Sequence, residues 1–212
     1  ELHRRCVAAG IEFANGRVRA VALGDDAAPH RVTIQRDDDV MERTARWVVD
    51  ASGRNRLLPR ELDLKRANGH NCNAAWLRVA TEIDVNRWSD DAGFHSRLVE
   101  GDRAMSTNHL MGEGYWVWLI RLASGATSVG IVADPMFHAF DGFNTLEKAM
   151  VWLRQHEPQC ADVLEQHRDE IQDFRVMKKY SHGVTKMYDG AARWCLTGDA
   201  GVFLDPLYSS GL

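Results

Sequence analysis

A short apolar run that breaks at a glycine and an aspartate constrains the fold more than any other feature. Trp-Cys-Leu-Thr at residues 194–197 is typical of a buried strand, and Gly198-Asp199-Ala200 interrupts it. Small residues let a ligand approach the backbone closely. An Asp at the carboxyl end of a sheet strand can accept hydrogen bonds from sugar-like hydroxyl groups, in the region where α/β folds bind ligands. An ordinary turn with a capping Asp is the alternative interpretation.

A second apolar run of the same kind lies nearer the beginning of the chain. Residues 45–51 contain Trp-Val-Val without interruption, which favours a strand buried on both faces, and the run breaks at Asp-Ala-Ser-Gly. Two further strand-like runs precede it, at 17–23 and 31–36. The first residues have helical spacing up to Gly10 and resemble the last turns of a helix. We therefore expect a β-meander followed by a return strand.

The middle of the chain predicts an antiparallel sheet with helices. Runs rich in Trp, Tyr, Val and Ile alternate with glycine-containing turns, a pattern typical of antiparallel strands. Two segments carry helical periodicity instead, while residues 87–98 follow no regular pattern. The expected strands are 72–84, 105–110, 114–122, 127–133 and 174–186, and the expected helices are 144–156 and 160–168.

The residues that follow Gly198 make the interpretation more specific. Asp205-Pro206 and Ser209-Ser210-Gly211 come after Gly198-Asp199-Ala200. This order resembles the second flavin-binding segment of FAD-dependent halogenases and related monooxygenases. The resemblance implies that Asp199 binds the ribityl chain of FAD and that Ser210 and Gly211 hold chloride through their backbone amides. Consecutive N–H groups in a tight turn do form an anion-binding nest. The cofactor-binding residues implied here are Gly198, Asp199, Ala200, Pro206, Ser209, Ser210 and Gly211.

Two other motifs resemble the same family, in the same order along the chain. The turn after residues 46–49 is similar to the one that passes the FAD pyrophosphate, which makes Asp50, Ala51 and Gly53 neighbours of the cofactor. The halogenases carry Trp-x-Trp-x-Ile-Pro, which is thought to shield the flavin. Here Trp116, Trp118 and Ile120 are kept, and Arg121 stands in place of the proline. Periodicity alone would explain the two tryptophans as one face of a strand.

The resemblance implies an α+β / α/β chain. It would be part of a glutathione-reductase-like FAD-binding fold joined to an antiparallel substrate domain. Residues 1–60 and 191–212 would belong to the FAD-binding domain and 61–190 to the substrate domain. The family's Gly-x-Gly-x-x-Gly and its active-site lysine lie upstream of these motifs and are not found here. We therefore expect an excerpt of a longer protein, and we assign no catalytic residue within it.

The expected function is that of a flavin-dependent halogenase. By resemblance it would use reduced FAD from a separate flavin reductase, oxygen and chloride, and act on a free or carrier-bound aromatic. Tyr208 stands where tryptophan halogenases have a glutamate, which favours a phenol- or pyrrole-type substrate. A monooxygenase (hydroxylase) or geranylgeranyl-reductase-like enzyme of the same fold is the alternative, and Arg121 is its best support. A domain that binds no flavin by itself is a third interpretation.

Composition excludes several other classes. The net charge of −4 and the absence of a basic stripe argue against nucleic acid as a partner. No apolar stretch approaches the ~18 residues of a transmembrane helix, and the beginning of the chain lacks the features of a signal peptide. The four cysteines are scattered, and His70 with Cys72 falls short of the about four ligands of a structural zinc. We expect a cytoplasmic protein without a metal site.

Overall fold

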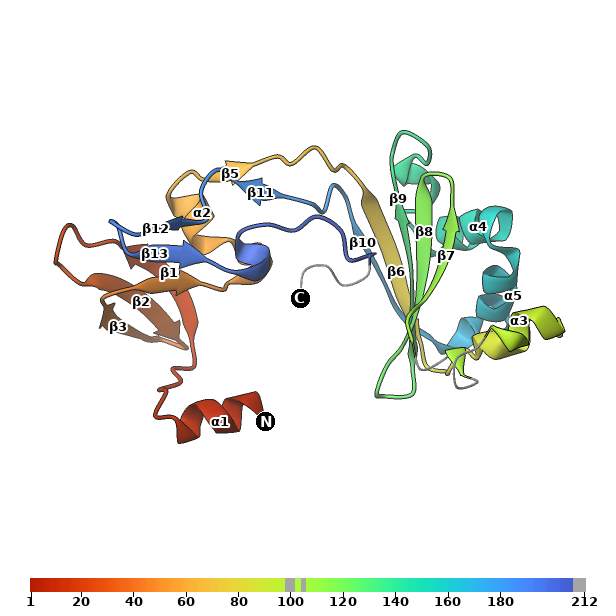
Figure 1. Ribbon diagram of the computed structural model, residues 1–212, viewed down its shortest axis with the longest axis horizontal. Coiled ribbons are helices and arrows are strands. Elements are labelled where there is room, and N and C mark those ends of the chain that lie inside the picture. The colour runs from red at the N-terminus through yellow and green to blue at the C-terminus, as the bar shows by residue number, and fades with distance from the viewer. Residues whose placement is uncertain (98–101, 104–105, 208–212) are drawn as a thin grey trace. The chain divides into compact units, whose positions relative to one another are not determined.

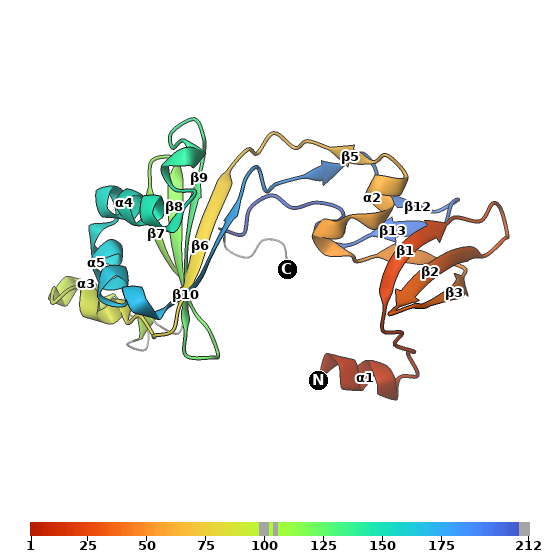
Figure 2. The same cartoon turned by 180° about the vertical axis from the view of Figure 1, so that it is seen from behind.

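The computed structural model describes residues 1–97, 102–103 and 106–207, which form two compact units. The first unit joins Glu1–Asn68 to the residues from His182 onward, and the second spans Gly69–Ser181. Helices are combined with antiparallel sheets and one parallel strand pair, so the predicted α+β class is confirmed. Figures 1 and 2 show the elements of each unit from two sides.

Two three-stranded sheets organise the first unit. One is an antiparallel meander, in the order β1-β2-β3, and the other has the order β12-β13-β4, with β13 and β4 parallel. A two-stranded ladder of β5 and β11 completes the strands. The elements are α1 (Leu2–Ala8), β1 (Arg17–Ala22), β2 (His30–Arg36), β3 (Asp39–Ala45), β4 (Val48–Asp50), η1 (Gly53–Asn55), α2 (Leu57–Glu61), β5 (Lys65–Arg66), β11 (Gly183–Val184), β12 (Tyr188–Asp189), β13 (Trp194–Leu196) and η6 (Gly198–Ala200).

The strand expected at 45–51 is in fact the end of one strand and the whole of another. β3 pairs with β2 up to Ala45, which lies opposite His30, and β4 begins three residues later at Val48. β3 escaped the sequence pattern because five of its seven residues are exposed, so it shows no alternation of apolar and polar positions. Asp37, in the left-handed region at φ 51°, forms the turn that leads into β3.

The first unit combines a small apolar core with buried hydrogen bonds. The core joins Leu58, Trp194 and Leu196. His30 is fully buried: its Nδ1 accepts the backbone N–H of Gly24 at 3.0 Å, and its Nε2 lies 3.2 Å from the carbonyl of Arg193. The Arg193 side chain returns to the carbonyl of Gly24 at 2.9 Å. The loop after β1 is therefore tied to the start of β13 by polar contacts.

One five-stranded antiparallel sheet organises the second unit, in the order β10-β6-β9-β8-β7. Figures 1 and 2 show α4 and α5 against one face of it. The Thr145 hydroxyl caps α4 by accepting the N–H of Lys148, and Pro158 occupies the first turn of α5. The elements are β6 (Asn73–Val79), η2 (Val85–Trp88), α3 (Ala92–Ser96), β7 (Asn108–Gly112), β8 (Tyr115–Arg121), β9 (Thr127–Ala133), η4 (Phe140–Gly142), α4 (Leu146–His156), α5 (Pro158–Gln166), η5 (Arg168–Glu170) and β10 (Ile171–Met177).

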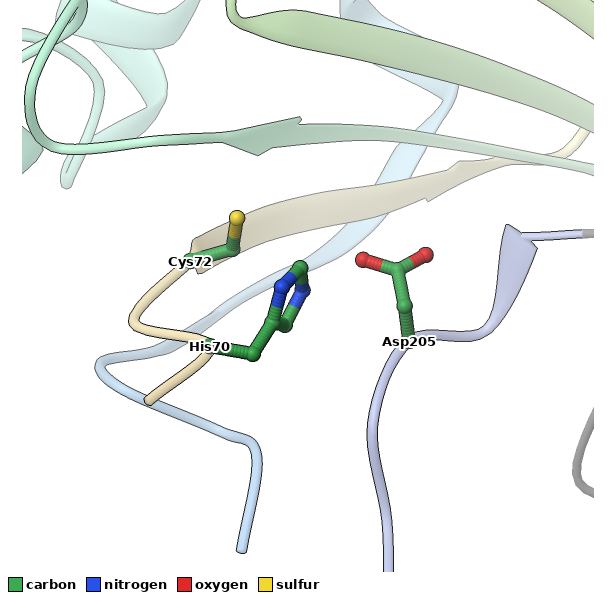
Figure 3. Close-up of side chains that lie close together, drawn as sticks. All are labelled: His70, Cys72 and Asp205. Carbon is green, nitrogen blue, oxygen red and sulfur yellow. The ribbon is translucent and has the colours of Figure 1, made fainter. Parts of the chain in front are cut away.

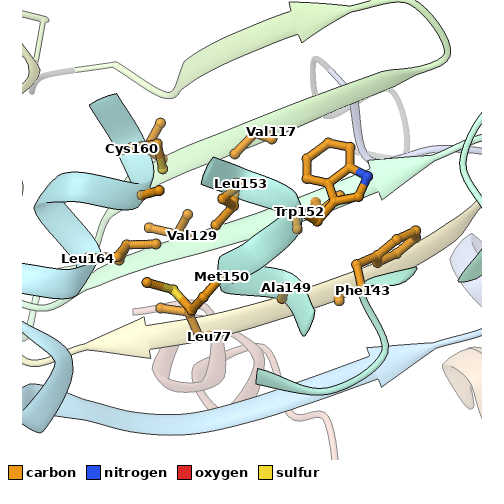
Figure 4. Packing of buried hydrophobic residues seen from close by; sticks show 14 of the residues in the cluster. Leu77, Val117, Val129, Phe143, Ala149, Met150, Trp152, Leu153, Cys160 and Leu164 are labelled. Atoms are coloured by element: carbon orange, nitrogen blue, oxygen red, sulfur yellow. The ribbon is translucent and has the colours of Figure 1, made fainter. Parts of the chain in front are cut away.

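The core of the second unit lies between the sheet and its helices (Figure 4). Side chains alternate between the two faces of a strand, so Val117 on β8 and Val129 on β9 point to the same side. They meet Met150 and Leu153 of α4 and Leu164 of α5, all of them buried. The opposite face of the sheet carries the side chains that point away from this core, and they are described below with the candidate site.

Three expectations in this unit need correction. The strand expected at 72–84 ends at Val79, and the one expected at 174–186 is β10 followed by the separate strand β11, because Lys179 adopts a left-handed conformation at φ 46°. Residues 87–98 are partly helical, since Asp84 and Asp91 accept backbone N–H groups and cap η2 and α3. Local side-chain hydrogen bonds of this kind leave little trace in hydrophobic periodicity.

Candidate functional site

The two predicted cofactor turns lie side by side in the first unit. β4 and β13 run parallel with Asp50 opposite Leu196, and the N–H of Thr197 donates to the carbonyl of Asp50 at 3.0 Å. The turns that follow these strands, η1 and η6, contact each other. Residues far apart in sequence thus meet at the carboxyl edge of a parallel strand pair, where α/β folds place their ligands.

Asp50 holds the first turn together. One carboxylate oxygen accepts the backbone N–H of Ser52 and the other that of Leu58, both at 2.8 Å, and the side chain is buried. These bonds fix the path of the chain from β4 to the start of α2. Asp50 therefore shapes the turn, while its neighbour Ala51 is exposed.

Asp199 is in the opposite situation. It is half-buried at the end of β13, and its carboxylate has no hydrogen-bond or ion-pair partner among the described residues. The next residue, Ala200, is fully buried and anchors the turn to the interior of the first unit. An acceptor held on a firm turn without an internal partner is suited to a ligand that carries hydroxyl groups.

Open space surrounds the glycines of both turns. Gly53 and Gly198 have left-handed φ values of 58° and 55°, and a Cβ built on either would meet no atom within 4 Å. A hollow of about 440 Å³ also borders Asp50 and Ala51, between β4 and the strands β1 and β2. The residues present thus fit a flavin nucleotide in two respects: a free carboxylate and room beside the backbone.

The segment after η6 is held by His182. Its backbone pairs with that of Phe203 in both directions, and its ring Nε2 lies 2.8 Å from the carbonyl of Asp199. Farther on, the Asp205 carboxylate accepts the N–H of Leu207 at 2.8 Å, and Pro206 is exposed. The predicted residues Ser209, Ser210 and Gly211, with Tyr208, lie outside the described residues.

The predicted shielding residues occupy the face of the second unit's sheet that points away from its helices. Val117 and Leu119 belong to the core, so Trp116, Trp118 and Ile120 project to the other side. His109 on β7 and Trp76 on β6 lie on the same side, across the ladders from β8 and β9. We call Trp76, His109, Trp116 and Trp118 the aromatic face.

Ring contacts and a glycine position this aromatic face. Trp116 and Trp118 have ring centroids 5.7 Å apart, Trp76 lies 6.5 Å from Trp118, and His109 lies 5.4 Å from Trp116. The indole of Trp118 covers Gly130, where a Cβ would come within 2.1 Å of it, and donates to the Ser128 hydroxyl at 3.1 Å. Burial lowers the pKa of His109. The face is thus a fixed, largely uncharged platform of π-systems.

Sequence reasoning missed Trp76, His109 and His182. Alternation along the predicted strands could have placed the first two on the face of Trp118, because the antiparallel pairing of neighbouring strands brings like faces together. No pattern identifies His182, since its contacts are with the backbone of residues 199–203 and depend on the tertiary fold.

Arg121, the residue that departs from the halogenase motif, is not part of the aromatic face. It has the strand parity of Val117 and Leu119, and its guanidinium forms an ion pair with Glu82 at 2.6 Å. Arg121 therefore contributes no side chain to the aromatic face.

His70 and Cys72 lie on the segment that leads into β6 (Figure 3). The carbonyl of Cys72 accepts the N–H of Tyr180, and the carbonyl of His70 accepts the Ser181 hydroxyl. Asp205, the third side chain drawn, belongs to the first unit. The backbone of this segment thus secures the residues that follow β10.

Among the helices of the described residues, none combines the length and the apolar character needed to cross a bilayer.

Comparison with known proteins concerns first the class of fold and then the family of the relatives. No protein-family profile matches the chain. A crystal structure of a flavoprotein/dehydrogenase from Cytophaga hutchinsonii superimposes with a TM-score of 0.74 at 26% identity, covering 99% of this chain and 47% of that one. The fold is therefore that of a flavoprotein.

Curated relatives narrow this class. The flavin-dependent halogenase chlA of Dictyostelium discoideum is 28% identical over 233 residues, covering 100% of this chain and 37% of its own length. A chlorinase of 1H-pyrrole-2-carbonyl-peptidyl-carrier protein from Pseudomonas fluorescens is 28% identical over 174 residues, covering 81% of this chain and 36% of its own. These matches support a relationship to the flavin-dependent halogenases. It spans little more than a third of the length of either relative.

Proposed function

We propose that the chain forms part of an FAD-dependent halogenase acting on an electron-rich aromatic of the phenol or pyrrole type. The observation that carries the proposal is the carboxyl edge of β4 and β13. There two glycine turns meet, and the Asp199 carboxylate is left without an internal partner. The superfamily relationship supports the same assignment, because its members are named for their dependence on flavin.

Each residue of the edge has a distinct task in holding FAD. Asp199 would accept hydrogen bonds from ribityl hydroxyls, and Gly53 and Gly198 would let the cofactor approach the backbone. Asp50 would act only through the turn that it shapes. Arg54, exposed beside Gly53, would add positive charge near the pyrophosphate. Bound FAD would supply the redox chemistry with oxygen and halide, while the chain provides position and electrostatics.

The aromatic face supports the substrate class. Indole rings bind planar, electron-rich rings by stacking or edge-on contact. The half-buried Trp76 and Trp118 present such surfaces, and the buried Trp116 packs beside Trp118. The Pseudomonas fluorescens relative is named as a chlorinase of a carrier-bound pyrrole, which is a ring of this class. A free or carrier-bound substrate of this kind is therefore part of the proposal.

Four elements of the proposal rest on the motif resemblance. Ser210 and Gly211 would hold the halide through their backbone N–H groups, and Pro206 and Ser209 would border the flavin ring. A separate flavin reductase would supply the reduced cofactor. The catalytic lysine of the family would come from residues upstream of the motifs described here.

A monooxygenase is the competing function, and Arg121 was its best support. Because Arg121 points away from the aromatic face and pairs with Glu82, that support is removed. Retention of Trp116, Trp118 and Ile120 on one face favours the halogenase instead.

The test uses the complete natural protein with a flavin reductase, FAD, oxygen and a panel of phenols and pyrroles. We expect a product with the isotope pattern of chlorine or bromine that forms only when the halide is present. Asp199→Ala should weaken FAD binding about tenfold or more, as expected when charged hydrogen bonds are lost. Asp205→Ala is the matched control at a carboxylate already bonded to Leu207. A hydroxylated product with no halide dependence would establish the monooxygenase.

A further inference from the structure

His182 is bound at three points to the segment that carries the Asp199 turn. It is 8% exposed, its N–H donates to the carbonyl of Phe203 at 2.8 Å, and its carbonyl accepts the N–H of Phe203 at 3.0 Å. Its ring Nε2 lies 2.8 Å from the carbonyl oxygen of Asp199. Because a carbonyl only accepts, Nε2 must carry the hydrogen in this bond.

The two backbone bonds and the ring bond serve different purposes. The backbone pair would form with almost any residue at position 182, since it requires only a main-chain N–H and C=O. The bond to Asp199 requires a side-chain donor at the distance of Nε2. The imidazole of His182 therefore adds one specific hydrogen bond to a backbone pairing with Phe203 that does not depend on the side chain.

That interaction fixes a peptide plane next to the proposed ligand group. The C=O of Asp199 and the N–H of Ala200 belong to one planar, trans peptide group and point to opposite sides. Holding the carbonyl against His182 sets the plane of that group. With Ala200 fully buried on the other side, the Cα–Cβ direction of Asp199 is also set. The Asp199 carboxylate, which has no internal partner in the described residues, thus owes its direction to His182.

Neighbouring contacts hold His182 itself in place. The side-chain amide of Asn68 donates to the carbonyl of Phe203 at 3.2 Å, so it supports the strand that His182 pairs with. The rings of His182 and Phe203 stack with planes 30° apart. Arg56 donates to the carbonyl of Gly183, the next residue, at 2.7 Å.

We propose that His182 is a positioning residue of the flavin site: its Nε2–H holds the carbonyl of Asp199 and so aims the Asp199 carboxylate at the ribityl hydroxyls. This inference rests on the proposed function and adds to it a residue outside the motifs quoted from the sequence. His182 touches no reacting atom, and it acts through Asp199.

The test compares three substitutions in the complete protein by titrating apoprotein with FAD and following the quenching of flavin fluorescence. The Gln amide nitrogen reaches the position of Nε2, whereas the Asn amide nitrogen reaches only that of Nδ1. We therefore expect His182→Gln to bind FAD within about threefold of wild type and His182→Asn to bind it about tenfold more weakly. His182→Phe keeps the ring stack without the donor and should match Asn.

A double-mutant cycle shows whether His182 acts through Asp199. In an Asp199→Asn background, the loss caused by His182→Asn should shrink to about threefold or less, because the two residues share one interaction. The absorbance spectrum of bound flavin should shift with Asn and Phe but not with Gln. Should His182→Phe fail to fold, the Gln and Asn pair decides the question alone.

The outcomes separate this inference from the proposed function. Equal FAD affinity for wild type, Gln and Asn would overturn the role of His182 and leave the flavin site standing. An equal loss with Gln and Asn, unaffected by Asp199→Asn, would also overturn it. Failure of the wild-type protein to bind FAD at all would overturn the proposed function and the role of His182 with it.

Discussion

The two units of this chain are stabilised in different ways. The second unit has one long antiparallel sheet and a continuous apolar core between the sheet and α4 and α5. The first unit has strands of two to seven residues, a core cluster of Leu58, Trp194 and Leu196, and buried hydrogen bonds around His30 and Asp50. Apolar packing supports the aromatic face, whereas individual hydrogen bonds support the cofactor turns. Substitutions in the two units should therefore destabilise the protein in different ways.

The largest expected effect is in the apolar core of the second unit. Leu164→Ala removes a fully buried side chain from α5 and should lower the free energy of unfolding by about 2–5 kcal/mol. Val151→Ala, at an exposed position of α4, is the control and should change it by less than about 0.5 kcal/mol. Urea denaturation measures both. Similar losses for the two would show that the core between α4, α5 and the sheet is not packed as described.

A smaller, more local effect is expected at the Asp50 turn. Asp50→Ala leaves the N–H groups of Ser52 and Leu58 without their acceptor and should cost about 2–3 kcal/mol. Hydrogen exchange should show faster exchange of these two amides, with the amides of β8 and β9 unchanged. Asp50→Asn, which keeps one acceptor oxygen, should protect one amide more than the other. Uniform acceleration across both units would contradict the separation between them.

A pH dependence is expected in the second unit, at a cluster beside its core. Both ring nitrogens of His138 have partners: Nδ1 accepts the indole N–H of Trp152 at 3.3 Å, and Nε2 lies 2.9 Å from the carbonyl of Glu113. His156 lies 4.9 Å from His138, near Tyr115 and Glu157. Burial and then the neighbouring His138 lower the pKa of His156, while Glu157 acts against them.

The sign follows from that lowered pKa. Folding favours the neutral ring, so its contribution to stability is fully present above the unfolded pKa of about 6.5 and is lost as pH falls from there through the lower pKa of the folded state. Melting temperatures measured between pH 7.5 and 5 should therefore fall toward acid, and His156→Gln should flatten the dependence. His95→Gln, on exposed α3, should leave it unchanged. If the melting temperature of the His156→Gln variant still falls toward acid pH, other groups are responsible for the pH dependence.

The smallest effect is expected at Arg121. Its ion pair with Glu82 joins two half-exposed side chains, and such pairs contribute about 0–1 kcal/mol. Arg121→Gln should therefore change stability little, and the ratio of halogenated to hydroxylated product should stay the same. A shift of that ratio toward hydroxylation or halogenation would show that position 121 reaches the site after all.

Sequence patterns found the parts of this fold that obey a period. β9 was expected at 127–133 and spans Thr127–Ala133, because every one of its residues except Ser128 is buried and apolar or small. The helix expected at 144–156 is α4, which begins at Leu146 and ends at His156. In both cases burial produces the pattern, so the pattern reveals the element.

What escaped prediction is held by hydrogen bonds instead of burial. β3 is mostly exposed, and α2 begins where Asp50 accepts the N–H of Leu58. The proposed cofactor turns were predicted because their residue types match a family motif, while His182 belongs to none of those motifs and only the tertiary fold brings it to Asp199. The periodicity of apolar residues therefore predicts elements that are buried, but it does not predict polar contacts between segments far apart in the sequence.

The contact between Trp118 and Gly130 has a consequence for engineering. The indole occupies the volume that any larger residue at position 130 would need, so the two positions cannot be varied independently. A library that changes Gly130 alone would mostly produce displaced or poorly packed tryptophans. Paired changes that enlarge residue 130 and shrink residue 118 would instead change the shape of the aromatic face without altering the backbone beneath it. These two codons are best randomised together.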